Sequence, residues 1–242
     1  MLAAKNESIE GFLSLAPDPP KPHALKNAIK LLIEIGALDD EENLTNLGHQ
    51  LVDLPIEPRL GKTVLAAVVL KCLDPILTIV CSLSYRDPFI HPTTDPERRN
   101  LKELKRGFFS LECDSDHITL VKAYRVWQES RSGNRRRNKE PSDYLSSATM
   151  FYIKNLRQQL LGQLRAAGFV RNGQKGGIKD EFGSIKDCNL NSDKWSVVKS
   201  ALVVGSYPNL ARAVEEGKSK VLKVITAENN YLIDSQERLK CK

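Results

Sequence analysis

Residues 59–84 constrain the fold more than any other part of the chain, because they form its most apolar stretch. The sequence Leu73-Asp74-Pro75 divides this stretch into two segments, and proline is well tolerated in the first turn of a helix. Both segments are apolar on nearly every side when they are wound as helices. They are therefore expected at the centre of a helical bundle, which we place at residues 59–168.

A smaller helical unit is predicted before the bundle. Its first helix shows apolar residues at helical spacing and ends at Gly36, a typical C-cap. Leu44 and Thr45 then predict a short extended piece and an N-cap for a second helix, from Asn46 to Asp53. This order is typical of a winged helix at residues 24–58. Residues 1–23 contain four prolines and predict an extended connector. The apolar positions of the first helix are Leu25, Ala28, Ile29, Leu32 and Ile35.

The remainder of the predicted bundle alternates helices with polar loops. We expect a loop at 85–97, helices at 98–111 and from Ser115 to Ser130, a basic loop at 131–139, and a long helix at 146–167 ending at Gly168. Residues 172–195 are rich in Gly, Asp, Asn and Lys and are expected to be mobile. A short helix from Trp195 and a strand around Val221, Val224 and Ile225 then predict a linker and β module at 169–242. The predicted fold is mainly α.

Net charge and cysteine usage narrow the partners and the compartment. A net charge of +6 and a pI near 9.0 suit a polyanion, either nucleic acid or an anionic membrane surface. The alternative is a basic surface that is merely solvated. No apolar run reaches the ~18 residues of a membrane span, and the N-terminal residues lack the apolar core of a signal peptide. Cys72 and Cys81 lie in apolar runs and predict core thiols in a reducing compartment, cytoplasmic or nuclear.

The chain shows no pattern of catalytic or metal-binding residues. Gly61-Lys62-Thr63 is similar to the end of a phosphate-binding loop, but that loop requires a glycine where Ile56 stands. The three residues are instead predicted to begin a helix. The histidines are scattered, and His117 beside Asp116 suggests capping or packing. We therefore expect no catalytic residue, no metal and no cofactor in this chain.

Several strings resemble DEAH/RHA-type RNA helicases. The string ALKNAIKLLIEIGALDDEENLTNLGHQLVDLPIEPRLGK resembles the winged-helix domain of that family, and CLDPILTIVCSLSYRDPF and SDHITLVKAYRVW resemble its ratchet, or helical-bundle, domain. The lead IEGFLSLAPDPP is similar to the stretch after the second motor domain. The string VVKSALVVGSYPNLAR resembles the entry to an OB-like domain. NSDKWSVVKSALVVGSYPNL and VVLKCLDPILTI are most similar to the branch that also carries a YTH domain.

The resemblance implies a fold and a role. It predicts a winged helix and a ratchet bundle followed by an incomplete OB-like module, all from the RNA-facing C-terminal region of a 3'-5' helicase. The family's Trp-Cys string before the long helix is reduced to its tail at Tyr144-Leu145, and its His-Pro-Ser turn is not found near 226–236. The RecA-like motor domains, which would bind ATP and Mg²⁺, are not encoded here. The chain is therefore expected to be a fragment without ATPase activity, and its predicted partners are those motor domains and single-stranded RNA.

Candidate RNA contacts centre on helix 146–167. Ile153, Leu156, Leu160 and Leu164 predict its buried face; Lys154, Gln158 and Arg165 lie roughly opposite, and Arg157 is expected at the border. Further candidates are Arg135, Arg136 and Arg137 in the basic loop, and Arg171. The alternative is an ordinary amphipathic helix with a solvated basic side. No aromatic stacking platform is evident from the sequence; Tyr207 and Phe169 are the candidates, although Phe169 is expected to pack inward.

Two functions remain open at this point. One is an RNA-binding accessory region of a helicase, and the other is a protein-interaction module from a catalytically inactive relative. Salt dependence distinguishes them, because phosphate contacts weaken steeply with salt and apolar docking does not.

Overall fold

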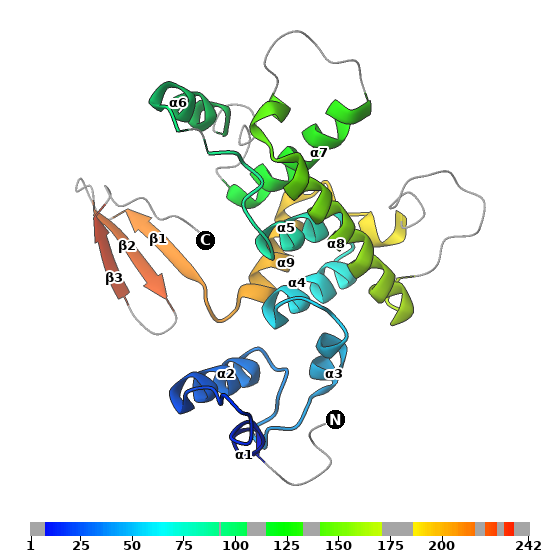
Figure 1. Cartoon of the computed structure of the whole chain (residues 1–242), viewed down its shortest axis with the longest axis vertical. Helices are drawn as coiled ribbons and strands as arrows, with labels where there is room; N and C mark the ends of the chain where they lie inside the picture. The colour runs from blue at the N-terminus through cyan, green and yellow to red at the C-terminus, as the bar shows by residue number, and fades with distance from the viewer. Residues whose placement is uncertain are drawn as a thin grey trace. The chain divides into compact units, whose positions relative to one another are not determined.

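The computed structural model describes residues 8–91, 93–105, 115–132, 141–170, 186–215, 221–226 and 230–234. The described residues are mainly helical, with three strands towards the C-terminus (Figure 1). They divide into two compact units. The first comprises Met1–Thr63 and Leu202–Leu239, and the second consists mainly of Val64–Ala201.

The first unit begins with two helices. Helix α1, Ile9–Leu13, is capped by Ser8, whose side-chain oxygen accepts a hydrogen bond from the Gly11 amide at 3.1 Å. The predicted extended connector at 1–23 is therefore wrong here, because an N-cap serine supports a short helix. Helix α2, Pro22–Glu34, ends as predicted at Gly36, whose φ of 78° carries no Cβ penalty.

A short bridge links α2 to the next helix. Leu38 and Leu44 pair in an antiparallel bridge, and α3, Asn46–Val52, follows directly. Thr45 caps α3 as predicted: its hydroxyl accepts from the Gly48 amide at 3.0 Å and donates to the Gly36 carbonyl at 2.6 Å. One hydroxyl thus joins the end of α2 to the start of α3, in the order expected of a winged helix.

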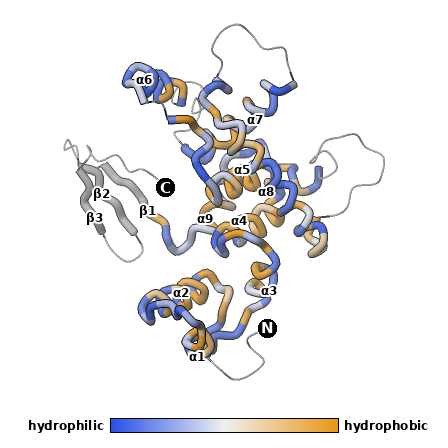
Figure 2. The backbone as a smooth tube through the Cα atoms, in the orientation of Figure 1, coloured by the Kyte–Doolittle hydropathy of each residue, from blue (hydrophilic) through white to orange (hydrophobic). Residues whose placement is uncertain are grey.

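The second unit is built around α5. Helix α4, Pro58–Val69, begins among the residues of the first unit and ends among those of the second, and α5, Leu73–Leu83, follows it as predicted. Helices α7, Asp116–Ser132, and α8, Ser147–Ala166, pack against α5 (Figure 1). Nine α5 residues are buried, and hydrophobic residues gather along this helix in Figure 2. The predicted position at the centre of a bundle is confirmed for α5. For α4 it is wrong in part, because Val69 at its C-terminal end is 79% exposed.

Two further elements belong to the second unit: helix α6, which starts earlier than predicted, and a 3-10 helix that leads into α8. Helix α6, Asp95–Leu104, starts about three residues earlier than predicted, because Pro96 suits the first turn and Thr94 adopts an extended N-cap conformation. The 3-10 helix Pro141–Tyr144 leads into Leu145, which pairs with Phe89 in an isolated bridge. Ser146 then caps α8, and Gly168, with a φ of 78°, follows the end of α8 as predicted.

The segment before α9 is not mobile throughout its length. Lys186–Asn189 forms a 3-10 helix, and the Asn191 side chain donates to the Leu70 carbonyl at 3.0 Å. The Asn191 amide donates to the Lys71 carbonyl at 2.9 Å. These bonds contradict the predicted mobility for residues 186–194, since they anchor the segment to the α4–α5 connection. The rest of the predicted mobile stretch, 172–185, lies outside the described residues.

The C-terminal elements are one helix and one sheet. Helix α9 spans Trp195–Ser206, and the strands are β1, Ala211–Glu215, β2, Val221–Thr226, and β3, Asn230–Asp234. They form an antiparallel sheet in the order β1-β2-β3, with Ala213 opposite Val224 and Lys223 opposite Leu232. The predicted strand at Val221–Ile225 is confirmed, while the OB-like module stays a prediction.

Candidate nucleic-acid interface

Helix α8 presents one buried face and one polar face, as predicted. Its buried residues include Met150, Ile153, Leu160, Leu161 and Leu164. Leu156, which was expected on this face, is only half-buried. Of the predicted RNA contacts, Gln158 is exposed, and Lys154 and Arg165 are half-buried. These three residues form what we call the basic edge of α8.

Arg157 does not belong to the basic edge. Its side chain is only 2% exposed, and its Nη2 lies 2.7 Å from Asp74 Oδ1. Its Nη1 donates to the Thr78 hydroxyl and, at 3.3 Å, to the Asp74 carbonyl. The expected border position of Arg157 is wrong, because α5 supplies the partners that a buried guanidinium requires. A residue so enclosed has a structural role here rather than a phosphate contact.

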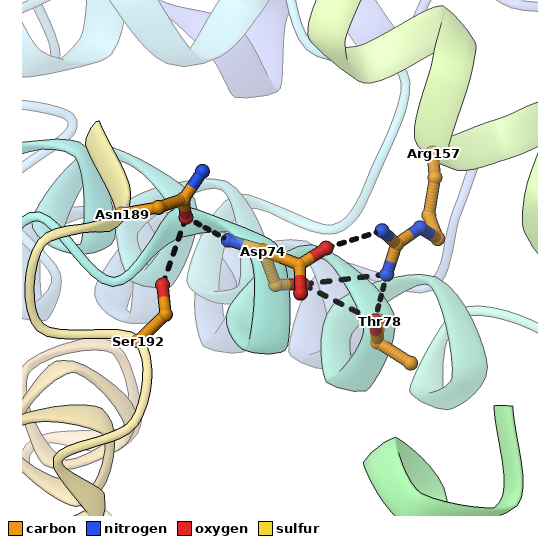
Figure 3. A network of polar contacts seen from close by, with 5 residues as sticks. All are labelled: Asp74, Thr78, Arg157, Asn189 and Ser192. Atoms are coloured by element: carbon orange, nitrogen blue, oxygen red, sulfur yellow. Dashed lines mark hydrogen bonds and ion pairs between the residues drawn. The ribbon is translucent and has the colours of Figure 1, made fainter. Parts of the chain in front are cut away.

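Asp74 is the centre of a polar network that also includes Arg157 and Thr78 (Figure 3). The Asp74 amide donates to Asn189 Oδ1 at 2.8 Å, and the Ser192 hydroxyl donates to the same oxygen at 2.8 Å. The guanidinium carbon also lies 4.5 Å from the ring centre of Tyr124 in α7. The network therefore ties α8, α7 and the 186–194 segment to the first turn of α5.

A signal for this burial was present in the sequence. At 100° per residue, Arg157 projects about 40° from Ile153 and about 20° from Leu164, inside the apolar face. Lys154 and Arg165 project about 100° and 120° from Ile153, at its margin. An arginine in the middle of an apolar face predicts a buried acidic partner, and Asp74 in the Leu73-Asp74-Pro75 sequence was the candidate.

Arg165 carries an unsatisfied donor. Its Nε is buried, and it has no hydrogen-bond partner within the described residues. This donor is able to pair with a further acceptor, as is the buried Nε of Arg59 in the first unit. A phosphate oxygen that bound at the basic edge would supply one.

The other candidates from the sequence are not brought together. Arg135, Arg136, Arg137 and Arg171 lie outside the described residues. Tyr207 is exposed after α9, and Phe169 is half-buried after α8.

An aromatic pair that the sequence did not reveal lies at the surface of the second unit. Tyr85, just after α5, stacks on Tyr152 of α8, with ring centres 3.9 Å apart and planes 24° from parallel. The next residue towards the N-terminus, Phe151, meets Trp127 edge-on at 5.1 Å. Tyr85 and Tyr152 are 67 positions apart in the sequence, so no local pattern could have paired them.

The Gly61-Lys62-Thr63 sequence lies in α4 and has packing contacts of its own. Lys62 Nζ donates to the Ile35 carbonyl at 2.8 Å, and Thr63 Oγ1 donates to the Arg59 carbonyl at 2.9 Å. A Cβ on Gly61 would lie 2.8 Å from Leu51 Cδ2. All three residues thus serve the packing of the first unit.

The core thiols match expectation. Cys72 and Cys81 are fully buried, and burial raises the pKa of Cys72 to about 11 and that of Cys81 to about 12. Arg157 acts in the opposite direction on Cys81 but does not outweigh burial. Burial also lowers the pKa of His117, against the influence of Asp116, as suits a packing role in the first turn of α7.

Within the described ranges, no three His, Cys, Asp or Glu residues gather in a way that could hold a metal ion. None of the helices that the structure describes is both long enough and apolar enough to cross a membrane.

Comparisons with known proteins agree with this architecture. The winged-helix part of the helicase associated domain (HA2) matches residues 28–56, and its ratchet-like part matches residues 57–120. The Arabidopsis thaliana DExH-box ATP-dependent RNA helicase DExH3 is 36% identical over 218 residues, which is 90% of this chain and 17% of that protein.

Human and rat relatives show a similar degree of likeness. The ATP-dependent DNA/RNA helicase DHX36 of Homo sapiens is 36% identical over 219 residues, or 89% of this chain and 21% of its own length. The Rattus norvegicus DHX36 is 36% identical over 227 residues. The chain therefore spans about a fifth of these relatives. With its helix order, its α5-centred bundle and these matches, the chain contains the winged-helix and ratchet-like domains of the helicase associated (HA2) region, and over about nine-tenths of its length it is similar to DExH-type RNA helicases.

Proposed function

We propose that this chain is an RNA-binding accessory region that contacts single-stranded RNA through the basic edge of α8. The main observation in support of this proposal is the composition of the basic edge. Lys154 and Arg165 flank an exposed Gln158, and Arg165 has a buried Nε without a partner in the described part of the chain. Phosphate contacts require only charge and reach, so sequence preference is expected to be slight.

The proposal implies that ATP hydrolysis is carried out by other domains of the parent protein. The relatives of this chain are named ATP-dependent helicases, and the chain spans about a fifth of their length. ATP and Mg²⁺ would bind RecA-like motor domains of the same parent protein. Three further statements stay predictions: unwinding in the 3'-5' direction, a cytoplasmic or nuclear location, and kinship to the YTH branch. Because the Lys62 side chain is directed to a backbone carbonyl in the first unit, we expect no ATP hydrolysis by the chain alone.

The test uses a charge-removing double variant and a charge-matched control. Lys154→Gln with Arg165→Gln should weaken binding of a single-stranded oligouridine and reduce the salt slope by roughly 0.7 for each phosphate that is no longer neutralised. Lys26→Gln with Lys30→Gln removes two charges from exposed positions of α2 and should change affinity little. Circular dichroism establishes that each variant is folded. An unchanged affinity and salt slope in the α8 variant would exclude the basic edge as the contact.

A second function is supported by the apolar surface of the first unit. Leu31, Leu32 and Ile33 of α2 are only half-buried, and Phe12 and Leu15 are exposed. Such a surface suits a protein partner, either the motor domains or another protein. A complex held by this surface should persist at salt concentrations that release RNA, because apolar burial is little screened.

A further inference from the structure

The exposed stack of Tyr85 and Tyr152 is not explained by the basic edge. The two rings lie 3.9 Å apart and nearly parallel, so each covers one face of the other. Tyr85 is nevertheless 40% exposed and Tyr152 47% exposed. If the stack served only to hold the loop after α5 against α8, contact between the two facing sides of the rings would be sufficient. The stack therefore leaves flat aromatic surface open to a ligand.

The charge around this stack favours an anionic ligand. The Arg86 guanidinium carbon lies 5.8 Å from the ring centre of Tyr85. The negative charge of the neighbouring Asp87 is partly balanced by Lys105, whose Nζ lies 3.8 Å from Asp87 Oδ2. A cation beside exposed rings is the combination that binds single-stranded nucleic acid, in which bases stack and phosphates pair with arginine.

The stack and the basic edge lie on opposite borders of the exposed face of α8. Tyr152 projects about 160° from Lys154 around the helix axis. Between them lie Phe151, which packs against Trp127 and Arg131 of α7, and the exposed, uncharged side chains of Asn155 and Gln159. Their amides can donate to and accept from base edges and sugars. A strand that crossed α8 would span one helix diameter, about 10–12 Å.

We propose that Tyr85 and Tyr152 form a base-stacking platform, and that single-stranded RNA crosses the exposed face of α8 from this platform to the basic edge. The inference rests on the proposed function, because it names a second contact of the same strand. The two contacts depend on different interactions with the RNA strand. The platform recognises the aromatic face that every base has, so its contribution depends on bases and little on salt. The basic edge recognises phosphates, so its contribution depends on salt and little on bases.

The experiment separates the two contributions with two oligonucleotides. One is a fluorescent single-stranded oligouridine, and the other is an abasic strand of equal length and charge. Fluorescence anisotropy with the full chain gives the affinity for each at several salt concentrations. Tyr152→Leu keeps an apolar side chain but removes the ring. It should weaken oligouridine binding about tenfold, with an unchanged salt slope and an unchanged affinity for the abasic strand.

Matched variants control for the fold and for the ring. Tyr152→Phe keeps the ring and should bind as the unaltered chain does. Tyr85→Leu lies in the loop after α5, and it should reproduce the Tyr152→Leu effect without a change within α8. A 2-aminopurine base in the oligonucleotide should also lose fluorescence on binding to the unaltered chain, since stacking quenches it.

Each outcome has one meaning. Equal losses for both oligonucleotides, or oligouridine affinity unchanged in both leucine variants, would overturn the platform and leave the basic edge standing. In the second case the exposed rings would be left to a protein partner. Failure of the unaltered chain to bind oligouridine even at low salt would overturn both the platform and the proposed function.

Discussion

Helices α5 and α2 both carry apolar residues at helical spacing, but they differ in how far their own units cover them. In α5, nine of the eleven residues from Leu73 to Leu83 are buried. In α2, Leu25 is the buried residue, and Leu31, Leu32 and Ile33 remain half-buried. Helix α5 is enclosed by its own unit, whereas α2 has apolar surface left over.

The difference teaches what periodicity can and cannot reveal. Apolar spacing indicates which side of a helix requires cover, but not whether the same unit supplies it. For α5 the cover comes from α7 and α8. For α2 we expect a partner protein to cover part of the apolar side of the helix. Local opening should therefore require less free energy in α2 than in α5, and hydrogen exchange measures that difference.

The largest expected effect comes from breaking the ion pair in the second unit. Asp74→Ala leaves the Arg157 guanidinium buried without its carboxylate, which lies 2.7 Å away in the intact pair. Removal of one partner from a buried pair costs about 3–5 kcal/mol. Amides of α5 and α8 should lose that much protection in hydrogen exchange, while α2, in the other unit, serves as an internal reference.

Two further variants define the cause. Glu34→Gln breaks the more exposed pair with Lys30, at 3.6 Å, and should cost no more than about 0.5 kcal/mol. A double change, Asp74→Asn with Arg157→Met, removes both charges and should recover much of the loss. A loss in Asp74→Ala no greater than that in Glu34→Gln would show that the network does not hold α5.

The next effect concerns the first unit. A Cβ at Gly48 would lie 2.8 Å from Leu44 Cδ2 and would press against the backbone carbonyl of Ala37. Gly48→Ala should therefore destabilise α2 and α3 by about 2 kcal/mol, since overpacking displaces backbone. Urea unfolding, followed with α2 and α3 amides as probes, measures the loss.

Gly162 provides the matched control for this substitution. It lies within α8, and a Cβ there would meet nothing within 4 Å. Gly162→Ala should stabilise the chain by about 0.5–1 kcal/mol, because alanine favours the helix. Equal destabilisation by both alanines would argue against the close approach at Gly48.

These residues also show how far sequence reasoning extends. Caps and periodicity predicted α2, α3, α5 and α8 because both signals are local. The basic edge was predicted for the same reason. The Asp74–Arg157 pair was missed although the helical wheel pointed to it, because an arginine was assumed to face water. The Tyr85–Tyr152 stack gave no signal, because it depends on how the loop after α5 meets α8.

A smaller effect should appear at high pH, and it arises in the α5 region. Burial raises the pKa of Cys81 to about 12 and that of Cys72 to about 11, from the usual 9.0. Below pH 9 both states hold these protons, so the thiols add no pH dependence. Between pH 9 and 11 the unfolded chain loses protons that the folded chain retains. Stability should then fall by about 1.4 kcal/mol per pH unit for each thiol.

A double variant isolates the thiol contribution from other titrations. Cys72→Ala with Cys81→Ala loses core packing, but its urea midpoint should fall less steeply between pH 9 and 10 than that of the unaltered chain. Tyrosine and lysine titrations are common to both proteins and cancel in the comparison. Parallel slopes would mean that the two thiols ionise in the folded state.

The smallest effect tests the assignment of Lys62 and returns to α2. Lys62 Nζ donates to the Ile35 carbonyl at 2.8 Å, where α2 ends and its carbonyls carry partial negative charge. Lys62→Met keeps the length of the side chain but removes the donor, so α2 should lose about 1 kcal/mol of protection. Lys26→Met, at an exposed position of the same helix, should change protection by a few tenths of a kcal/mol at most. The same pair of variants distinguishes the packing role from a phosphate-binding one. If Lys62 bound nucleotide instead, Lys62→Met would abolish ATP turnover by the chain and leave α2 protection unchanged, because the lysine would then interact with phosphate and not with Ile35.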